Sequence, residues 1–230
     1  MSDRQPVIVF ALFPRVTQLD FTGPYQVFSS LPGATVILAS TDGGSIETAG
    51  ITFAGLRRLA DIEACDVICV PGGFGVTEYA IRDEAFLREL RRLAASARYV
   101  TSVCTGSLAL GAAGLLRGKR AATHWAWRDL LAPFGATADP ARVVRDGNVI
   151  TGGGVTAGID FALTVVAELA GPDVAQAIQL QIEYAPAPPF DSGSPETAPA
   201  AILAKVRDRN EAMAAGRRQA VEAAAARLPV

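Results

Sequence analysis

The chain has 230 residues, of which half are hydrophobic and 19% charged, and its 21 Lys and Arg against 23 Asp and Glu give a formal net charge of −2. This composition excludes a disordered chain, and without a Lys/Arg cluster we expect no nucleic-acid partner. Three cysteines are too few for a disulfide scaffold. We find no signal peptide and no apolar stretch of membrane-spanning length, so we expect a cytoplasmic protein with reduced thiols and no membrane partner.

The first half of the chain alternates apolar runs with helical patterns. Continuous apolar runs of strand length suit a parallel sheet that is covered on both faces. A Pro near the first turn marks one helix start, with Thr22 or Gly23 as its cap. In chain order we predict a strand at 7–13, a helix at 22–31, a strand at 34–40, a hairpin at 45–53, a strand at 66–70, a helix at 84–97, a strand at 98–103 and a helix at 105–116.

The second half continues the alternation and then changes character. We predict a short strand at 121–123, a helix at 124–131, a hairpin at 142–151, a helix at 156–169, a proline-rich segment at 185–199 and a long helix at 200–228. The alternation predicts a doubly wound α/β sheet whose strand-to-helix turns meet at the carboxyl edge, where such folds bind ligands.

We expect two units, an α/β domain over residues 1–184 and a C-terminal extension over 185–230. The extension comprises the proline-rich segment and the long helix. That helix is predicted to pack on the α/β domain or on a second subunit through a thin apolar stripe. The stripe consists of Ile202, Leu203, Val206, Met213 and Val221.

The most informative stretch is the strand that ends at Cys104 and the run of small residues that opens the next helix. A sharp turn there exposes the side chain at the sheet edge. It also places sulfur at the positive end of a helix, which favours the nucleophilic thiolate. The alternative is that Cys104 is a small buried hydrophobe. Cys65 and Cys69 are interpreted as core cysteines, and with one His in the chain we expect no metal site.

Two further side chains are predicted to lie at the same sheet edge. Asp20 follows the first strand between Leu19 and Phe21, where desolvation favours its protonated form and makes it a general acid; the alternative is a helix cap. His124, the only histidine, follows a predicted strand. It is either a proton-transfer partner of Cys104 or a hydrogen-bonded structural residue beside two tryptophans.

The glycine-rich segment 71–75 follows a buried strand. Gly72 and Gly73 allow backbone N–H groups to point into the site, as oxyanion-hole donors do. An ordinary turn with positive φ is the alternative interpretation. A phosphate-binding P-loop is excluded because no Gly-Lys-Ser/Thr follows.

Several motifs together resemble the ThiJ/PfpI superfamily. They are VPGGFG (70–75), SVCTGSLALGAAGLL (102–116), ATHW (122–125) and TGGGVTAGID (151–160). The resemblance covers residues 7–169. It implies a flavodoxin-like α/β sandwich with its nucleophilic cysteine at the strand-to-helix elbow, and a homodimer.

Within the superfamily the chain is most similar to the isocyanide hydratases, through QLDFTGP (18–24) and APAPPF (185–190) among other segments. This resemblance implies hydration of a small-molecule isocyanide to a formamide through a Cys104 thioimidate, without metal or organic cofactor. Asp20 would act as general acid and base, and the Thr105 hydroxyl would tune Asp20 or the thiolate. Gly72 and Gly73 would stabilise charge, and Phe74, His124 and Trp125 are candidate substrate-binding residues.

One departure from the superfamily is informative. Its protease-like branch has His directly after the cysteine, where this chain has Thr105, so a Cys–His peptidase is disfavoured. Two other functions stay open. One is a glyoxalase-like or deglycase-like enzyme acting on 2-oxoaldehydes. The other is a non-catalytic redox sensor in which Cys104 oxidises reversibly.

Overall fold

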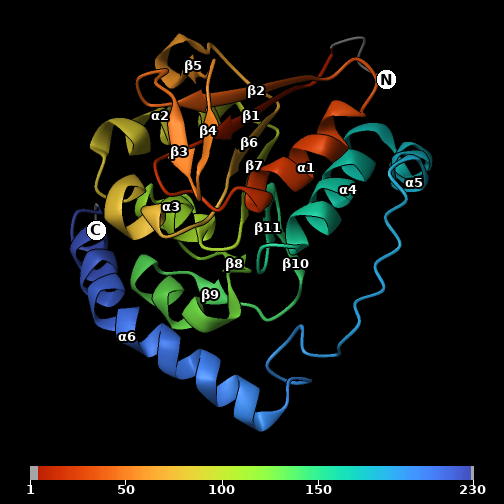
Figure 1. Cartoon of the computed structure of the whole chain (residues 1–230). Helices are drawn as coiled ribbons and strands as arrows, with labels where there is room; N and C mark the ends of the chain where they lie inside the picture. The colour runs from red at the N-terminus through yellow and green to blue at the C-terminus, as the bar shows by residue number, and fades with distance from the viewer. Residues whose placement is uncertain (1–4, 229–230) are drawn as a thin grey trace.

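The apolar runs form the centre of a seven-stranded sheet in the computed structural model, which describes residues 5–228 (Figure 1). The strand order is β10-β11-β7-β6-β1-β2-β5, and all neighbours are parallel except β10 and β11. The strands are β1 (Val7–Ala11), β2 (Thr35–Ser40), β5 (Arg57–Arg58), β6 (Val67–Val70), β7 (Tyr99–Val103), β10 (Val143–Asp146) and β11 (Val149–Gly152). Every residue of β6, β7 and β11 is buried, which confirms the prediction of a doubly wound sheet.

Helices cover both faces of this sheet (Figure 1). On one face α1 (Leu19–Ser29) packs against α4 (Ala157–Ala170), and α4 packs against α5 (Pro172–Gln181). On the other face lie α2 (Glu84–Ser96), α3 (Gly106–Ala112), the π-helix η2 (Val76–Ala80) and the 3₁₀ helix η3 (Trp125–Phe134). The smaller elements are β3 (Ile46–Thr48) and β4 (Ile51–Phe53), which form the predicted hairpin, η1 (Leu59–Asp61), and the pair β8 (Arg120–Ala121) and β9 (Thr137–Ala138).

Helix α2 shows how local sequence fixes these elements. The Asp83 side chain accepts the backbone N–H groups of Ala85 and Phe86, which caps the helix start. The buried face contains the five apolar residues expected from the helical spacing: Phe86, Leu87, Leu90, Leu93 and Ala94.

Several predicted boundaries differ from the structure: the first strand ends at Ala11, β8 is limited to Arg120–Ala121, and α6 ends at Ala225. The differences that bear most on the site are in three helices. Helix α1 begins at Leu19 rather than at residue 22, so Pro24 lies inside it and packs beside Gly158 of α4. Helix α3 ends at Ala112 rather than 116, and η3 runs through Pro133 to Phe134 instead of ending at 131. In α1 the carbonyls of Thr17 and Gln18 accept the first helical N–H bonds, which places Asp20 in the first turn.

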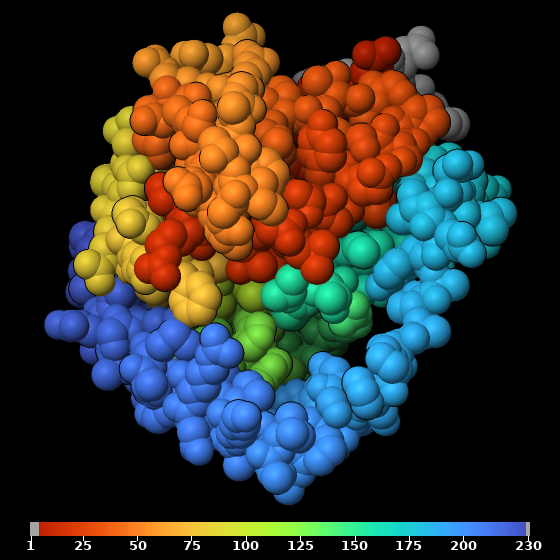
Figure 2. Space-filling view, in the orientation of Figure 1, coloured from red at the N-terminus to blue at the C-terminus, as the bar shows by residue number. Residues whose placement is uncertain are grey.

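The long C-terminal helix α6 (Ala200–Ala225) runs along the lower edge of the body and contacts η3, α3 and η2 (Figures 1 and 2). Its predicted apolar stripe is confirmed only in the second half of the helix: Val221 is buried and Met213 packs against the core, whereas Ile202 and Val206 are exposed. The buried residues lie in its second half and are small except for one arginine: Ala214, Arg217, Ala220, Val221 and Ala224. Among residues 5–228, no helix combines the length and the apolar character that crossing a bilayer requires.

Candidate active site

Cys104 lies in the sharp turn between the end of β7 and the start of α3. Its φ is +56°, a left-handed conformation that costs a non-glycine residue about 1–3 kcal/mol. The Cys104 N–H holds this turn by donating to the Gly153 carbonyl oxygen at 2.7 Å. The turn also requires Gly106, whose Cβ would lie 2.0 Å from the Val70 carbonyl oxygen. This is the predicted strand–nucleophile–helix elbow.

Asp20 reaches the same point from the first turn of α1 and is completely buried. Its Oδ2 accepts the Gly72 N–H at 2.8 Å, whereas its buried Oδ1 has no hydrogen-bond partner among residues 5–228. Burial raises the pKa of Asp20 to about 7, although the Gly72 N–H and the Cys104 side chain lower it. Oδ1 is therefore the oxygen available to hold a proton near neutral pH, as the flanking apolar residues predicted.

Thr105 connects the glycine-rich loop to the nucleophile. Its hydroxyl oxygen accepts the Gly73 N–H at 3.0 Å. The sequence predicts that the Gly72 and Gly73 N–H groups are free to act as oxyanion-hole donors. In the structure each has a partner within the protein, since Gly72 donates to Asp20 and Gly73 donates to Thr105. They orient the acid and the hydroxyl rather than facing a substrate oxygen.

The sequence predicts that the start of α3 lowers the pKa of Cys104 and stabilises its thiolate, but the structure gives a raised pKa. Burial, followed by the charge of Asp20, raises the pKa of Cys104 well above its ordinary value, because the side chain is buried at 5% exposure. The backbone N–H groups of Thr105 and Val155 and the Thr105 hydroxyl lower the pKa, as the elbow predicts, but by less. Both of the larger effects thus favour the protonated thiol over the thiolate.

His124 caps η3, because its Nδ1 accepts the Ala126 N–H at 3.3 Å. Burial, together with the positive charges of Arg217 and Arg128, lowers the pKa of His124 to about 4. The imidazole is thus neutral at neutral pH and does not stabilise a thiolate as a cation would. This environment supports the structural interpretation of His124.

The two predicted aromatic substrate contacts border different cavities. Trp125 and His124 line a cavity of about 340 Å³ together with Gly153 and Val155. The segment 193–196 also lines this cavity. It belongs to the light-blue connection between α5 and α6, which Figure 2 shows running along one side of the molecule. Phe74 borders a separate cavity of about 200 Å³ beside α6.

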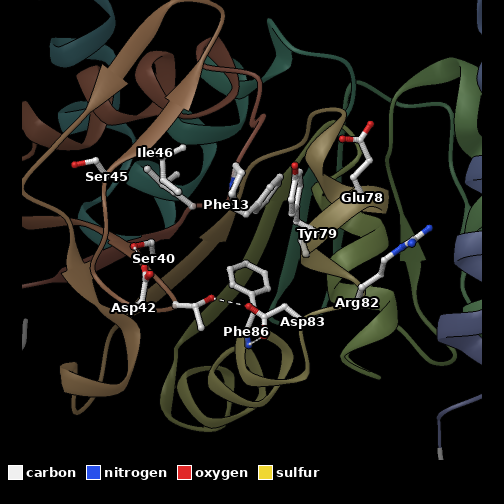
Figure 3. A pocket seen from close by; sticks show the side chains of 14 residues that line it. Phe13, Ser40, Asp42, Ser45, Ile46, Glu78, Tyr79, Arg82, Asp83 and Phe86 are labelled. Atoms are coloured by element: carbon white, nitrogen blue, oxygen red, sulfur yellow. Dashed lines mark hydrogen bonds between the residues drawn. The ribbon is translucent and has the colours of Figure 1, made fainter.

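A third cavity, of about 500 Å³, lies between the carboxyl ends of β1 and β2 and the helices η2 and α2 (Figure 3). Its walls include Ser40, Asp42, Tyr79 and Asp83, and neither Cys104 nor Asp20 lines it. Figure 3 shows Glu78 and Arg82 on the opposite side of Tyr79 from Ser40 and Asp42. This cavity is therefore separate from the nucleophile.

Sequence reasoning missed two groups near Cys104. The Val155 N–H interacts with the sulfur, and the only signal for it is its position after the glycine run 152–154. Arg217 of α6 lies within electrostatic range of the same sulfur. No local pattern marks Arg217, since it is one of several arginines on a mixed-charge helix.

Gly72→Ala is expected to lower the free energy of unfolding by about 1–3 kcal/mol, the usual cost of overpacking. The new Cβ would lie 2.6 Å from the Thr105 nitrogen, 2.7 Å from the Thr105 hydroxyl oxygen and 2.8 Å from Asp20 Oδ2. Urea denaturation measures the change. The matched control is Gly216→Ala in α6, where a Cβ meets nothing within 4 Å and alanine should stabilise the helix. Equal effects of the two variants would contradict this steric argument.

Comparisons with known proteins agree with this geometry. The DJ-1/PfpI family model matches residues 6–168. The chain is 56% identical over 222 residues to the isonitrile hydratase of Pseudomonas putida, covering 96% of this chain and 97% of that protein. A crystal structure of a ThiJ/PfpI family protein from Pseudomonas syringae superposes with a TM-score of 0.90 at 40% identity, covering 96% of this chain and 91% of that one.

A more distant structure, DJ-1β of Drosophila melanogaster, shares the fold at 23% identity with a TM-score of 0.72, covering 80% of this chain and all of that one. The family match spans most of the α/β body and includes both Asp20 and Cys104. The flavodoxin-like prediction is confirmed at the level of the fold. With its buried acid beside a cysteine elbow, this chain belongs to the DJ-1/PfpI family.

Proposed function

We propose that this protein is an isonitrile (isocyanide) hydratase, which adds water to R–N≡C to give the formamide R–NH–CHO. The observation that carries this proposal is the 56% identity, along nearly the whole of both chains, to the isonitrile hydratase of Pseudomonas putida. The arrangement of Asp20, Gly72, Thr105 and Cys104 supports it, because the reaction needs a nucleophile and a proton donor that act on the same carbon.

The first half of the reaction adds the thiol across the terminal carbon of the isonitrile. Asp20 takes the proton from the Cys104 sulfur, and the thiolate attacks that carbon. Asp20 then delivers the proton to the same carbon, which gives the thioimidate R–N=CH–S–Cys104. No atom is lost in this half, so the enzyme gains the mass of one isonitrile.

The second half adds water to the thioimidate. Asp20 accepts a proton from the attacking water, the water oxygen bonds to carbon, and Asp20 passes the proton to the nitrogen. The resulting R–NH–CH(OH)–S–Cys104 collapses when Asp20 takes the hydroxyl proton, the carbon–sulfur bond breaks, and Asp20 returns that proton to the sulfur. The products are the formamide and the regenerated Cys104 thiol. Asp20 thus moves protons in both halves, which suits a carboxyl whose pKa burial raises to about 7.

Thr105 and the glycine-rich loop position these groups. The Gly72 N–H fixes Asp20 Oδ2 and leaves Oδ1 for the proton, and the Gly73 N–H fixes the Thr105 hydroxyl beside the sulfur. The N–H groups of Thr105 and Val155 stabilise negative charge on Cys104. Every step uses side chains and backbone groups of the protein itself.

The oligomeric state and the cellular location of the protein are part of this proposal. We infer a cytoplasmic homodimer. The inference is supported by the family resemblance and by exposed apolar side chains on α1 and β4, such as Leu19, Tyr25 and Ile51. Sedimentation of the purified protein at twice the 24.0 kDa chain mass is the expected result, and sedimentation as a 24.0 kDa species would contradict it.

The test of the function is a product assay with an aryl isonitrile. Chromatography should show the N-aryl formamide accumulating at many turnovers per protein molecule. Intact-mass measurement after acid quench should show an adduct equal to one whole isonitrile. Absence of formamide, together with conversion of methylglyoxal to lactate by the same preparation, would instead establish a 2-oxoaldehyde enzyme.

A further inference from the structure

A buried arginine of the C-terminal helix α6 packs against two aromatic residues near the candidate site. Arg217 is only 7% exposed, and its guanidinium lies between two aromatic rings, 4.5 Å from the Trp127 ring centroid and 5.4 Å from that of Phe74. Phe74 directly follows the loop whose N–H groups hold Asp20 and Thr105. Trp127 belongs to η3, which begins just after Thr123, and the Thr123 hydroxyl donates to the Cys104 carbonyl oxygen at 3.1 Å. Arg217 therefore joins the two segments that flank the nucleophile.

The guanidinium has an unused donor. Arg217 Nη1 is buried and has no hydrogen-bond acceptor among residues 5–228. The two rings restrain the guanidinium by stacking but accept none of its hydrogen bonds in the plane. A buried charged donor without a partner is costly, and such groups are kept in proteins mainly where a ligand or an ordered water completes them.

Other charges near Arg217 leave room for an anion. The carboxylate that lines the same cavity, Glu78, is already held by Arg15, whose Nη1 donates to Glu78 Oε1 at 2.7 Å. The cavity of about 200 Å³ beside Arg217 is also lined by Arg82, which projects on the same side of η2 as Glu78 (Figure 3). This cavity therefore has an excess of positive charge once the Arg15–Glu78 pair is counted.

Arg217 and the nucleophile are close enough to affect each other. Burial lowers the pKa of Arg217, whereas the charges of Cys104 and Glu78 raise it. An arginine stays protonated even when it is buried. The contacts with Phe74 and Trp127 therefore hold a fixed positive charge beside the two segments that flank Cys104.

We propose that Arg217 is a specificity-determining residue, and that the preferred substrates are isonitriles whose R group carries a carboxylate that pairs with the unpartnered Nη1. This inference rests on the proposed function and names its substrate class. A planar carboxylate matches the guanidinium fork, and the Phe74 and Trp127 rings keep the fork in one orientation. Neutral isonitriles would react at the same sulfur without this additional contact.

The test compares 4-isocyanobenzoate with its methyl ester, which differ by one negative charge. In the wild-type protein kcat/KM should be at least about 10-fold higher for the carboxylate, the factor that a charge-assisted hydrogen bond provides, with most of the difference in KM. Arg217→Gln should bring the ratio of the two kcat/KM values to about 1, and Arg217→Lys should keep part of the preference. The matched control is Arg218→Gln, since Arg218 faces Asp129 and Glu211 and is not stacked on either ring.

Binding of the corresponding product gives a readout that does not need turnover. Quenching of Trp125 and Trp127 fluorescence should show 4-formamidobenzoate binding more tightly than its methyl ester, and Arg217→Gln should remove this difference. If wild type turns over neither isonitrile but binds the carboxylate through Arg217, the proposed function fails and the anion site stands. Equal kinetics and equal binding for the acid and the ester, or equal losses in the Arg217 and Arg218 variants, would overturn the inference.

Discussion

Asp20→Asn is expected to lower kcat by about 10²–10⁴-fold and, at pH 8, to make the protein more stable. Asparagine has nearly the shape of the protonated acid and can still accept the Gly72 N–H, but it transfers no proton. The activity falls because asparagine cannot transfer the proton. The stability rises because the native carboxyl is buried where its charge is unfavourable.

The stability effect has a defined pH dependence. The pKa of Asp20 rises from 3.8 to about 7 on folding, so the folded protein binds the proton more tightly than the unfolded chain. The associated stability is fully present below pH 3.8 and is lost as the pH rises through 7, a total of about 4 kcal/mol. The stability gain of Asp20→Asn should therefore be near zero at pH 4 and approach this value at pH 8.

Urea denaturation at pH 4 and pH 8 measures the change in the free energy of unfolding of Asp20→Asn and of a control variant at Asp42. Asp42 provides the matched control, because the Gly44 N–H and neighbouring backbone lower the pKa of this exposed aspartate. Asp42→Asn should thus bring no gain in stability at pH 8. If the increase in the free energy of unfolding of Asp20→Asn is the same at both pH values, the charge of Asp20 is not what destabilises the folded protein.

Cys104→Ala is expected to reduce isonitrile turnover to the uncatalysed background. The substitution removes the sulfur that forms the thioimidate, and Asp20 alone supplies only a proton. It should also abolish the intact-mass adduct, because burial raises the pKa of the two other cysteines, Cys65 and Cys69, to about 12. These thiols stay protonated and inaccessible at neutral pH.

Cys65→Ala is the matched control for this variant. It makes the same chemical change at a buried cysteine outside the site, so its kcat should stay close to that of the wild type. Formamide chromatography and intact mass compare the two variants side by side. Wild-type turnover by Cys104→Ala, or a persistent adduct in that variant, would exclude the covalent mechanism.

Local patterns predicted the sheet, the α2 helix and the elbow, because each depends on neighbours in the sequence. The uninterrupted apolar runs gave the buried strands, and the small residues after Cys104 gave the sharp turn. The predicted start of α1 is wrong because proline is favoured in the first turn of a helix, whereas Pro24 lies farther inside α1. Packing of Pro24 against Gly158 of α4, far along the chain, accommodates it inside the helix instead.

In the candidate site, too, the residues set by local sequence could be predicted and the contacts set by tertiary packing could not. Cys104 and Asp20 could be predicted from the strands that precede them, and burial of Asp20 from its apolar neighbours. The partners of the Gly72 and Gly73 N–H groups could not, because they depend on how three loops meet. The burial of Arg217 could not be predicted because it follows from the docking of α6 on η3 and η2, and nothing in the sequence distinguishes this arginine from the others on the helix.

The position of Arg217 near the end of the chain affects the order in which the protein is assembled during translation. The α/β body leaves the ribosome well before α6 does, and chains fold from the N-terminal side as they emerge. A nascent chain therefore positions Asp20 and Cys104 while the surface formed by Phe74 and Trp127 is still uncovered. Arg217 packs against the two rings only when α6 is released, so this contact forms after the elbow and the buried acid are in place.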